Sequence, residues 1–472
     1  MFHDAPILGV TRDVAGFRVA SFGCMGSPFP RGPRLPGALQ AVLYQRNRAR
    51  FIAAMGRRYG DVFTLRVPPY ADHVVVFSRP EHIKEIFAGN PQDLHAGEGN
   101  QILGNVMGEH SVLITDEAEH ARARRLLMPA FNGASLRGYR DLVASLARAE
   151  VDRWSAASEL RAHDRMNAVT LDVIMRVVFG VTDAHTHDQL APRLTRLVDI
   201  RPYILLGWVF PRLNRVGPWK RVRDNQNEID ALLYDEIQRR RRAADLGRRT
   251  DVLSRLLQAG DQGDDPPLTD AELRDQLVTL LLAGHETTAA ALAWTLHEVA
   301  RHPELQRRAQ EAADEGDERY LEAALKESMR LHPVIASTSR KLTRDQIIGG
   351  WHLPAGTVVQ TSIVLAHQCP DSYPDATTYR PQRFLGGEVE PNTWLPFGGG
   401  VRRCIGAGFS LMEGTAVLRE ILTRYALSPP PGGGSEPGRM RNITMVPSRG
   451  ARITITPRHS VAQHKSTAPR PG

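Results

Sequence analysis

The pattern of apolar positions predicts a mostly helical chain. Apolar residues recur at helical spacing along most of the sequence after about residue 115. The longest run starts at Thr269, where Thr-Asp-Ala-Glu places Glu272 three residues after the cap and forms a capping box. It continues to Val299 and predicts a buried helix of about eight turns. Helices are expected to end at His302-Pro303 and at His332-Pro333, because the residue before a proline disfavours helical backbone.

Short β-branched runs interrupt this helical pattern. Val62–Val67 and His73–Phe77 flank Pro68-Pro69 and predict a hairpin. A second strand-rich stretch, Ile347–Val364, is expected to join the same small sheet. Near the C-terminus, the strand-like Arg452–Ile455 follows a loop rich in proline and glycine and predicts a last hairpin. The expected fold class is therefore mainly α with small β-sheets (α+β).

One large domain is expected over residues 33–456. Residues 1–32 form a leader segment that ends in prolines and glycines, and the polar residues 457–472 are predicted to be a disordered tail. The segment Ser428–Gly438 is not a domain linker, because too little chain follows it to bury a core.

Composition narrows the class of protein only a little. Lys and Arg total 60 and Asp and Glu total 52, so the net charge is +8. This charge permits an acidic partner without naming one, and the sequence has no recognisable nucleic-acid-binding motif. The densest basic run, Arg239–Arg242, continues a helical pattern and is predicted to be a solvent-exposed helix face.

The three cysteines, Cys24, Cys369 and Cys404, are far apart and odd in number, which does not indicate a disulfide framework. A reducing cytosol fits them best. The N-terminal residues contain no sustained apolar stretch, so we expect neither a signal peptide nor a membrane anchor. No stretch offers the roughly 18 uncharged apolar residues of a membrane span. The sequence therefore predicts a soluble, cytoplasmic protein.

The most specific segment is the loop Phe397–Gly406, which reads Phe-Gly-Gly-Gly-Val-Arg-Arg-Cys-Ile-Gly. Three glycines allow a tight turn and let the backbone lie flat against a large ligand. Cys404 stands just before a predicted helix, where backbone N–H groups and the charge of Arg402 favour a thiolate. Such a sulfur suits an iron porphyrin. The spacing matches neither a phosphate-binding loop nor a zinc site, while a buried structural cysteine stays open as an alternative.

The middle of the long helix, Ala283–Thr288, reads Ala-Gly-His-Glu-Thr-Thr and works against helical regularity. Glycine weakens a helix interior by about 1 kcal/mol relative to alanine, and a carboxylate among apolar residues is costly unless it is satisfied. Adjacent threonines can bond back to carbonyls and bend the helix. A widened turn that holds a small ligand, with a hydroxyl and an acid relaying protons to it, would explain the pattern. A satisfied polar core would explain it equally well.

The loop fits F-x-x-G-x-R-x-C-x-G at every fixed position and so resembles the haem-binding signature of the cytochrome P-450 superfamily. The resemblance runs from about residue 33 to residue 456. It implies the family's single-domain fold, with haem b between the long helix and the helix after the cysteine. It also implies Cys404 as the axial iron ligand and a haem propionate contact for Arg402, with Phe397 and Gly406 at other fixed positions of the haem-binding loop.

The middle of the long helix resembles the family's oxygen-activating stretch, [AG]-G-x-[DE]-T-[ST]. By this resemblance, Thr287 would hold the hydrogen-bond network of bound oxygen, and Glu286 would feed protons into it. Ala283 and Gly284 would form the groove wall over the iron.

Two further groups of residues fit family motifs. Glu327 and Arg330 match E-x-x-R and, with Arg383 of a P-x-R-F-like segment, would form a buried structural triad. The haem propionates would be contacted by three residues outside the cysteine loop, namely His120 and Arg124 of an H-x-x-x-R pair, and Arg340. The charge state of the histidine stays open.

The resemblance implies a monooxygenase that inserts one atom of O2 into a substrate and releases the other as water. Because the chain has no flavin or Rossmann fingerprint, electrons from NAD(P)H are expected to arrive through a separate ferredoxin or flavoprotein reductase. By analogy, the substrate pocket or its entrance would be lined by three stretches, Ala96–Gly108, Tyr203–Phe210 and Val334–Thr338. Their apolar residues predict an apolar small-molecule substrate.

Alternatives remain within and beyond this reaction class. Some superfamily members are isomerases or peroxygenases, although Thr287 and its acidic neighbour favour oxygen activation. A haem-based sensor or carrier is the non-enzymatic alternative. The sequence does not name the substrate, the position that is oxidised or the native electron donor.

Overall fold

The computed structural model describes residues 29–154, 158–180, 184–198, 211–259, 266–386 and 389–458. Helices dominate these residues, and small sheets complete the α+β fold that the sequence predicted. The predictions for residues 1–28 and 459–472, for Cys24 and for the pocket-lining stretch 203–210 lie outside the described residues.

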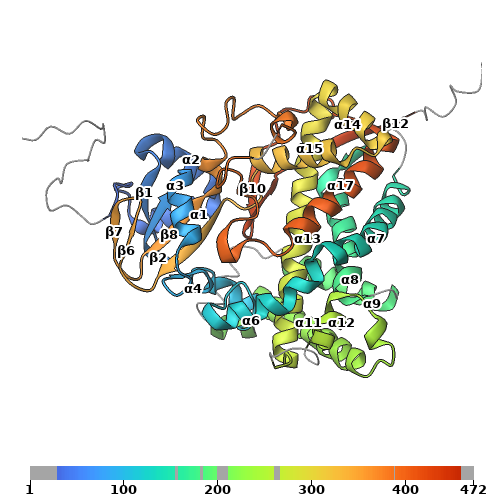
Figure 1. Cartoon of the computed structure of the whole chain (residues 1–472), viewed down its shortest axis with the longest axis horizontal. Helices are drawn as coiled ribbons and strands as arrows, with labels where there is room; N and C mark the ends of the chain where they lie inside the picture. The colour runs from blue at the N-terminus through green and yellow to red at the C-terminus, as the bar shows by residue number, and fades with distance from the viewer. Residues whose placement is uncertain are drawn as a thin grey trace, which may run out of the picture.

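Two groups of elements make up the molecule. Figure 1 shows the five-stranded sheet and the first helices at one side and the long helices at the other. The first three helices are α1 (Gly37–Arg46), α2 (Arg48–Tyr59) and α3 (Pro80–Ala88). The later helices are α4 (Ala96–Gly99), α5 (Gly104–Met107), α6 (Glu117–Leu127), α7 (Gly133–Val151), α8 (Ala162–Phe179), α9 (Ala184–Val198), α11 (Gly217–Arg241), α12 (Val252–Ala259), α13 (Asp270–Arg301), α14 (Pro303–Glu315), α15 (Glu318–Leu331), α16 (Ile363–Ala366) and α17 (Ala407–Arg424). Short 3-10 helices are η1 (Gln101–Leu103), η2 (Met128–Phe131), η4 (Pro211–Arg215), η5 (Leu246–Arg248), η6 (Pro381–Phe384) and η7 (Gly400–Arg402).

The five-stranded sheet joins segments from both halves of the chain. Its strand order is β1 (Val62–Val67), β2 (Ala71–Phe77), β8 (Val358–Ser362), β5 (Ser337–Leu342) and β3 (Leu94–His95). β1 and β2 form the predicted antiparallel hairpin, and β8 pairs with β2 in parallel, Val74 opposite Val358. The expectation that the stretch Ile347–Val364 joins the first hairpin is therefore confirmed for β8 but not for residues 347–353. A separate short hairpin is formed by β6 (Gln346–Ile348) and β7 (Trp351–Leu353).

The C-terminal strands differ from the prediction. The last hairpin is formed by β10 (Gly438–Arg441) and β11 (Thr444–Pro447). Residues 452–455 do not belong to it. They lie in β12 (Arg452–Pro457), which pairs on its two edges with β4 (Glu159–Arg161) and β9 (Tyr425–Ser428). These partners are distant in sequence, so local turn signals could not reveal them.

Helix α13 is the central element of the helical half. It begins after Thr269 with the predicted capping box and ends just before His302-Pro303. By length and composition it could cross a membrane, yet 72% of its most apolar window is buried inside the protein. Helix α8 packs closely against it, since a Cβ on Gly284 would lie 2.6 Å from Cδ1 of Ile174. We conclude that α13 is a core helix and that Gly284 permits this close packing.

One basic residue of the predicted exposed face is buried instead. Arg240 is 3% exposed and donates hydrogen bonds to Glu236 and Asp251 at 2.6 and 2.7 Å. It also bonds the carbonyl of Phe179 at the end of α8. The prediction that Arg239–Arg242 is wholly solvent-exposed was therefore wrong for this residue, because two carboxylates offset its charge in the core.

A fully buried ion pair connects α15 to the chain that precedes the cysteine loop. Arg330 and Glu327 have no exposed surface, and they meet through two hydrogen bonds of 2.7 and 2.9 Å. Nε of Arg383 lies 3.3 Å from Glu327, which completes the expected triad. Arg330 also donates to the carbonyl oxygens of His367 and Ala376, both at 2.8 Å. The predicted triad is thus present.

The imidazole of His367 extends this network to the cysteine loop. Burial, followed by the charge of Arg330, lowers the pKa of His367 to about 3, so its ring is neutral. Nε2 accepts a hydrogen bond from the backbone N–H of Leu395 at 2.8 Å, so Nδ1 carries the proton and donates to the Arg330 carbonyl at 3.1 Å. The Leu395 carbonyl then accepts from the N–H of Gly398 at 3.0 Å. The triad is therefore bonded to the cysteine loop through one histidine.

Helix α17 buries a carboxyl group, Glu413, that the sequence reading did not single out. Its side chain is 1% exposed, and neither carboxyl oxygen has a hydrogen-bond partner among the described residues. Burial raises the pKa of Glu413 well above its ordinary value. Burial in the folded protein therefore favours the protonated form of this carboxyl.

Glu327→Gln should destabilise the fold by about 3 kcal/mol or more, because it leaves a buried guanidinium without its carboxylate. Chemical unfolding of the purified protein would measure this loss. Glu322→Ala, on the same helix, removes a partly exposed pair with Lys326 (2.6 Å) and should cost about 0.5 kcal/mol or less. Equal losses in the two variants would contradict the structural role of the triad.

Glu413→Gln should become more stabilising, relative to wild type, as the pH rises from about 5 to about 8. In the unfolded chain this carboxyl ionises near its ordinary pKa, whereas the folded protein must keep it protonated. Wild-type stability therefore falls by about 1.4 kcal/mol per pH unit above the unfolded pKa, until the folded carboxyl ionises. Unfolding curves of both proteins across this range give the difference. A difference that is independent of pH would contradict the prediction.

Candidate active site

The cysteine loop has the tight turn that its glycines predicted. Gly398 and Gly400 both have φ of 63°, in the left-handed region that favours glycine. A Cβ on Gly399 would overlap the ring of Phe87, and one on Gly400 would overlap the Phe87 carbonyl oxygen. The close approach of this backbone is thus to α3, on the sheet side of the molecule. The glycines therefore serve the tight turn and the packing contact with Phe87. Sequence reasoning had explained the flat backbone by contact with a ligand instead.

Cys404 lies at the exit of the loop, and its side chain is exposed. Its N–H donates to the Phe397 carbonyl at 2.9 Å, and Gly406 caps the start of α17. Surrounding protein atoms displace much of the water around the sulfur, which raises the pKa of the Cys404 thiol. The Gly406 N–H and the charges of Arg124 and Arg403 lower this pKa, but by less. The protein alone thus favours the thiol, whereas metal coordination would favour the thiolate.

Arg402 does not supply the positive charge that the sequence reading assigned to it beside the sulfur. Its guanidinium forms an ion pair with Asp116 and donates to the carbonyl oxygens of Val112 and Thr115 at 3.2 and 2.7 Å. Asp116 precedes α6 and also accepts from the N–H groups of Gly97 and Glu98, so it ties three segments together. Sequence reasoning missed Asp116, although an acid just before a helix is a recognisable signal.

The four residues predicted to contact haem propionates lie near one another, and three of them, Arg124, Arg340 and Arg402, are positively charged. His120 is buried, and its pKa is lowered to about 3, first by burial and then by the charges of Arg402, Arg124 and Arg340. Burial and the charge of Arg402 lower the pKa of Arg340 to about 10. The histidine whose charge the sequence left open is therefore neutral. Three guanidinium groups converge here, and Asp116 forms an ion pair with one of them, Arg402.

This cluster fits a ligand with two carboxylates. Burying several like charges together is unfavourable unless anions offset them, and guanidinium groups pair well with carboxylates. Among the described residues, no three His, Cys, Asp or Glu side chains gather at metal-ligand spacing. A metal at the single sulfur of Cys404 would therefore take its other ligands from a cofactor. A porphyrin with two propionates satisfies both requirements.

Ala283 and Thr287 lie on one face of α13, one turn apart. Ala283 is exposed in the middle of this core helix, and the Thr287 hydroxyl donates to its carbonyl at 2.7 Å. The helix stays continuous through residues 283–288, so the widened turn that the sequence reading considered is absent. On an adjoining face, the hydroxyls of Thr288 and Ser410 lie 3.1 Å apart and connect α13 to the first turn of α17. This contact brings residues 283–288 and the helix after Cys404 together.

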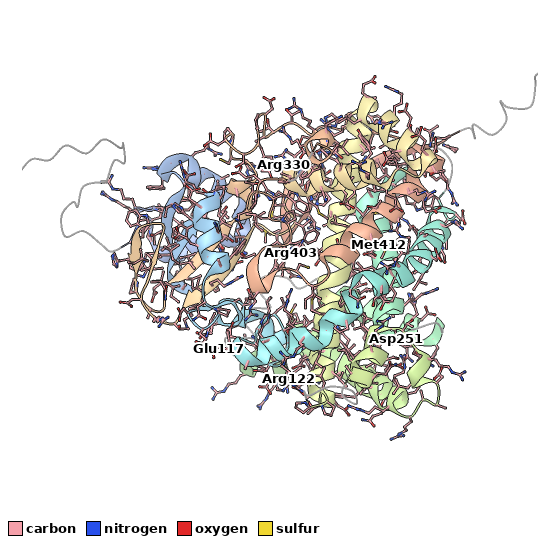
Figure 2. All side chains as sticks on the ribbon, viewed as in Figure 1. Glu117, Arg122, Asp251, Arg330, Arg403 and Met412 are labelled. Carbon is pink, nitrogen blue, oxygen red and sulfur yellow. The ribbon has the colours of Figure 1, made fainter. Side chains whose placement is uncertain are left out.

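Figure 2 shows this arrangement, with Arg403 just before α17, Met412 along the same helix, and α13 beside them. Sequence reasoning missed Ser410, because a serine in the first turn of a helix is an ordinary surface residue until its partner is known. It also missed the partner of Glu286. This carboxylate is 4% exposed and forms an ion pair with Arg441 of β10, whose Nε lies 3.4 Å from Oε1.

Comparisons with known proteins show similarity over most of the chain. The sequence profile of the family described as "Cytochrome P450" matches residues 28–455. A Mycobacterium tuberculosis protein, provisionally named cytochrome P450 135A1, is 60% identical over 428 residues, which cover 91% of this chain and 95% of that protein. A Mycobacterium bovis protein, provisionally named cytochrome P450 135B1, is 42% identical over 440 residues, which cover 92% of each chain.

A solved structure shows the same fold. Retinoic acid-bound cyanobacterial CYP120A1 superposes with a TM-score of 0.79 at 23% sequence identity, covering 91% of this chain and all of that one. At this identity the likeness concerns the fold alone. With the family profile spanning most of the sequence and the mycobacterial relatives matching over most of their lengths, the chain belongs to the cytochrome P450 family.

Proposed function

We propose that this protein is a haem-thiolate monooxygenase that inserts one atom of O2 into an apolar organic substrate. The observation that carries the proposal is the accessible Cys404 sulfur at a glycine turn, with a cluster of buried cations nearby and Thr287 on the helix that contacts α17. Membership of the family supports the reaction class.

The cofactor would be haem b, held by residues of several elements. Cys404 would bind the iron, and the loop backbone at Phe397 and Gly406 would fix the direction of the sulfur. The propionates would be bound by His120, Arg124, Arg340 and Arg402. Neutral His120 can donate one ring N–H to a propionate, while each guanidinium offers a charged donor. When bound, a haem with a thiolate ligand supplies O–O bond cleavage.

Residues of α13 would handle oxygen and protons. Ala283 and Gly284 would form the groove wall, with the methyl group of Ala283 toward the cofactor, since this residue is exposed. The Thr287 hydroxyl donates to the Ala283 carbonyl, which leaves its oxygen lone pairs able to accept a hydrogen bond. Glu286 would pass protons from solvent toward this hydroxyl.

Substrate and electron donor are inferred more broadly. Buried Val106 and Met107 in the stretch that follows α4 support an apolar guest. Two electrons from NAD(P)H would come through a separate ferredoxin or flavoprotein reductase, because the sequence carries no fingerprint of its own for flavin or NAD. We place the protein in the cytoplasm, as the sequence predicted, and do not assign α13 as a membrane span, because most of its apolar window is buried inside the protein.

Turnover with a surrogate reductase separates this proposal from its alternatives. A panel of apolar compounds is first screened for ligand-induced shifts of the haem absorbance. Product that requires reductase, NAD(P)H and O2 supports monooxygenation. Product formed with peroxide alone, or without any oxidant, identifies a peroxygenase or an isomerase, and ligand binding without product identifies a sensor or carrier.

Cys404→Ser should abolish the thiolate-type absorbance spectrum of the reduced carbon-monoxide complex, because a serine hydroxyl cannot replace an anionic sulfur ligand. The spectrum of purified wild type and variant checks this. Cys369→Ser is the matched control, since this partly buried cysteine lies outside the loop and should leave the spectrum unchanged. A thiolate spectrum that survives Cys404→Ser would refute the assignment of the iron ligand.

Thr287→Ala should retain haem and its thiolate spectrum but divert reducing equivalents to hydrogen peroxide, with less product per NAD(P)H consumed. Thr287→Ser should restore most of the coupling. Thr295→Ala is the matched control, because Thr295 makes the same bond to the carbonyl four residues earlier (2.8 Å) two turns along the helix. Coupling equal to wild type in Thr287→Ala would remove the proposed role of the hydroxyl.

A further inference from the structure

The carboxylate of Glu286 is buried on α13, and its ion-pair partner comes from a different part of the chain. Arg441 stands at the end of β10, and its side chain is 19% exposed, against 5% for Glu286. A buried carboxylate is unfavourable without a compensating charge. Nε of Arg441 lies 3.4 Å from Oε1 of Glu286. How strongly the charged form of Glu286 is stabilised therefore depends on where the C-terminal hairpin places Arg441.

The β10–β11 hairpin holds Arg441 on a fixed support. Its strands pair from Gly438 opposite Pro447 to Arg441 opposite Thr444, and Thr444 Oγ1 donates to the Arg441 carbonyl at 2.8 Å. Both backbone groups of Met445 are bonded outside the hairpin: its carbonyl accepts from Trp294 Nε1 of α13, and its N–H donates to the Val334 carbonyl. Figure 1 shows β10 between the strand-rich half and α13. The hairpin is thus anchored to α13 beyond the ion pair itself.

Other charged groups around this pair come from several elements. The charges of Arg439 on β10 and Arg161 on β4 reach His163 of α8, as does that of Arg441. His163 and His285 are themselves neutral near pH 7, because burial and neighbouring cations lower the pKa of each to about 4. Arg161 is ion-paired with Asp164 of α8 at 3.2 Å. Arg441 itself forms an ion pair with the buried carboxylate of Glu286.

We propose that Arg441 is a positioning residue for proton delivery, which fixes the carboxylate of Glu286 and sets the pH at which that carboxylate binds a proton. This inference rests on the proposed function. The carboxylate takes a proton from hydronium in the solvent and releases it to the Thr287 hydroxyl as that hydroxyl passes its own proton on to the oxygen being reduced, which returns Glu286 to its charged form. Because the guanidinium favours the charged form, its distance from Glu286 governs how readily the proton is taken up. A ligand that moves the hairpin would therefore change proton delivery.

The hairpin also contacts a segment predicted to line the substrate pocket. The N–H of Met445 donates to the carbonyl of Val334, at the start of the stretch Val334–Thr338 and three residues before β5 begins. The hairpin therefore contacts Val334 through Met445 and Glu286 through Arg441. This connection gives a physical route by which a bound substrate could influence Glu286 without contacting it.

The first test measures protonation directly and needs no turnover. Difference infrared spectroscopy of the purified haem protein follows the carbonyl stretch of protonated carboxylic acids during a pH titration, with Glu413 as a constant background. Arg441→Ala should move the protonation midpoint of one carboxyl upward by about one to three pH units. The moving band should vanish in Arg441→Ala combined with Glu286→Gln. Arg441→Lys should restore most of the wild-type midpoint, and Arg441→Gln replaces the alanine variant if that protein is unstable.

Arg439→Ala is the matched control, since Arg439 is an exposed arginine two residues earlier on the same strand. It should leave the Glu286 band unchanged. With a surrogate reductase and a substrate from the screen, Arg441→Ala should also change the pH profile of product per NAD(P)H, and this change should be absent in the Glu286→Gln background. An unmoved band in Arg441→Ala, or an equal pH change in both backgrounds, would overturn the proposal.

Failure of this inference is distinguishable from failure of the proposed function. If wild type lacks the thiolate spectrum or forms no product, the proposed function fails whatever the infrared band does. If wild type shows both and the band in Arg441→Ala behaves as in Arg439→Ala, only the role of Arg441 is refuted.

Discussion

The fully buried guanidinium group of Arg330 connects the helical core to the cysteine loop. Its charge is compensated by Glu327 within the same helix, and Arg383 adds a second cation to that carboxylate. The remaining donors of Arg330 go to backbone carbonyls, one of them at His367, and the neutral ring of His367 receives the N–H of Leu395. Removing Glu327 would leave the Arg330 charge uncompensated. It would thereby weaken the hydrogen bonds that run from Arg330 through His367 to the segment before Cys404.

The site itself is organised by an excess of positive charge. Arg124, Arg340 and Arg402 lie close enough to lower the pKa of His120, and Asp116 offsets one of the three charges. A protein that buries cations in this way is most stable when an anion joins them. A haem held by Cys404 would therefore add to the stability of the fold, because its carboxylates would offset the charge of this cluster.

Helix α13 contacts α8, α17 and the C-terminal hairpin through different faces. Gly284 admits Ile174 of α8, Thr288 meets Ser410 of α17, and Glu286 meets the C-terminal hairpin. Exposed Ala283 and half-buried Thr287 lie on the remaining face, which is where the proposed function would have oxygen and substrate bind. The unusual composition of this stretch thus follows from packing as much as from chemistry, so glycine and carboxylate here have structural partners as well as proposed catalytic roles.

The sequence by itself determined the features that depend on neighbours within a turn or two. The capping box at Thr269, the one-face spacing of Glu327 and Arg330, and the glycine turn before Cys404 are fixed by local backbone geometry, and the first hairpin by its turn and its β-branched runs. Tertiary structure alone decided which distant groups meet. It turned Arg402 toward Asp116, buried Arg240, moved residues 452–455 into another sheet and brought Arg441 to Glu286. Ion pairs and strand pairs between distant residues leave no periodic pattern in the sequence. A buried ion needs only one partner, and the fold can bring that partner from any position in the chain.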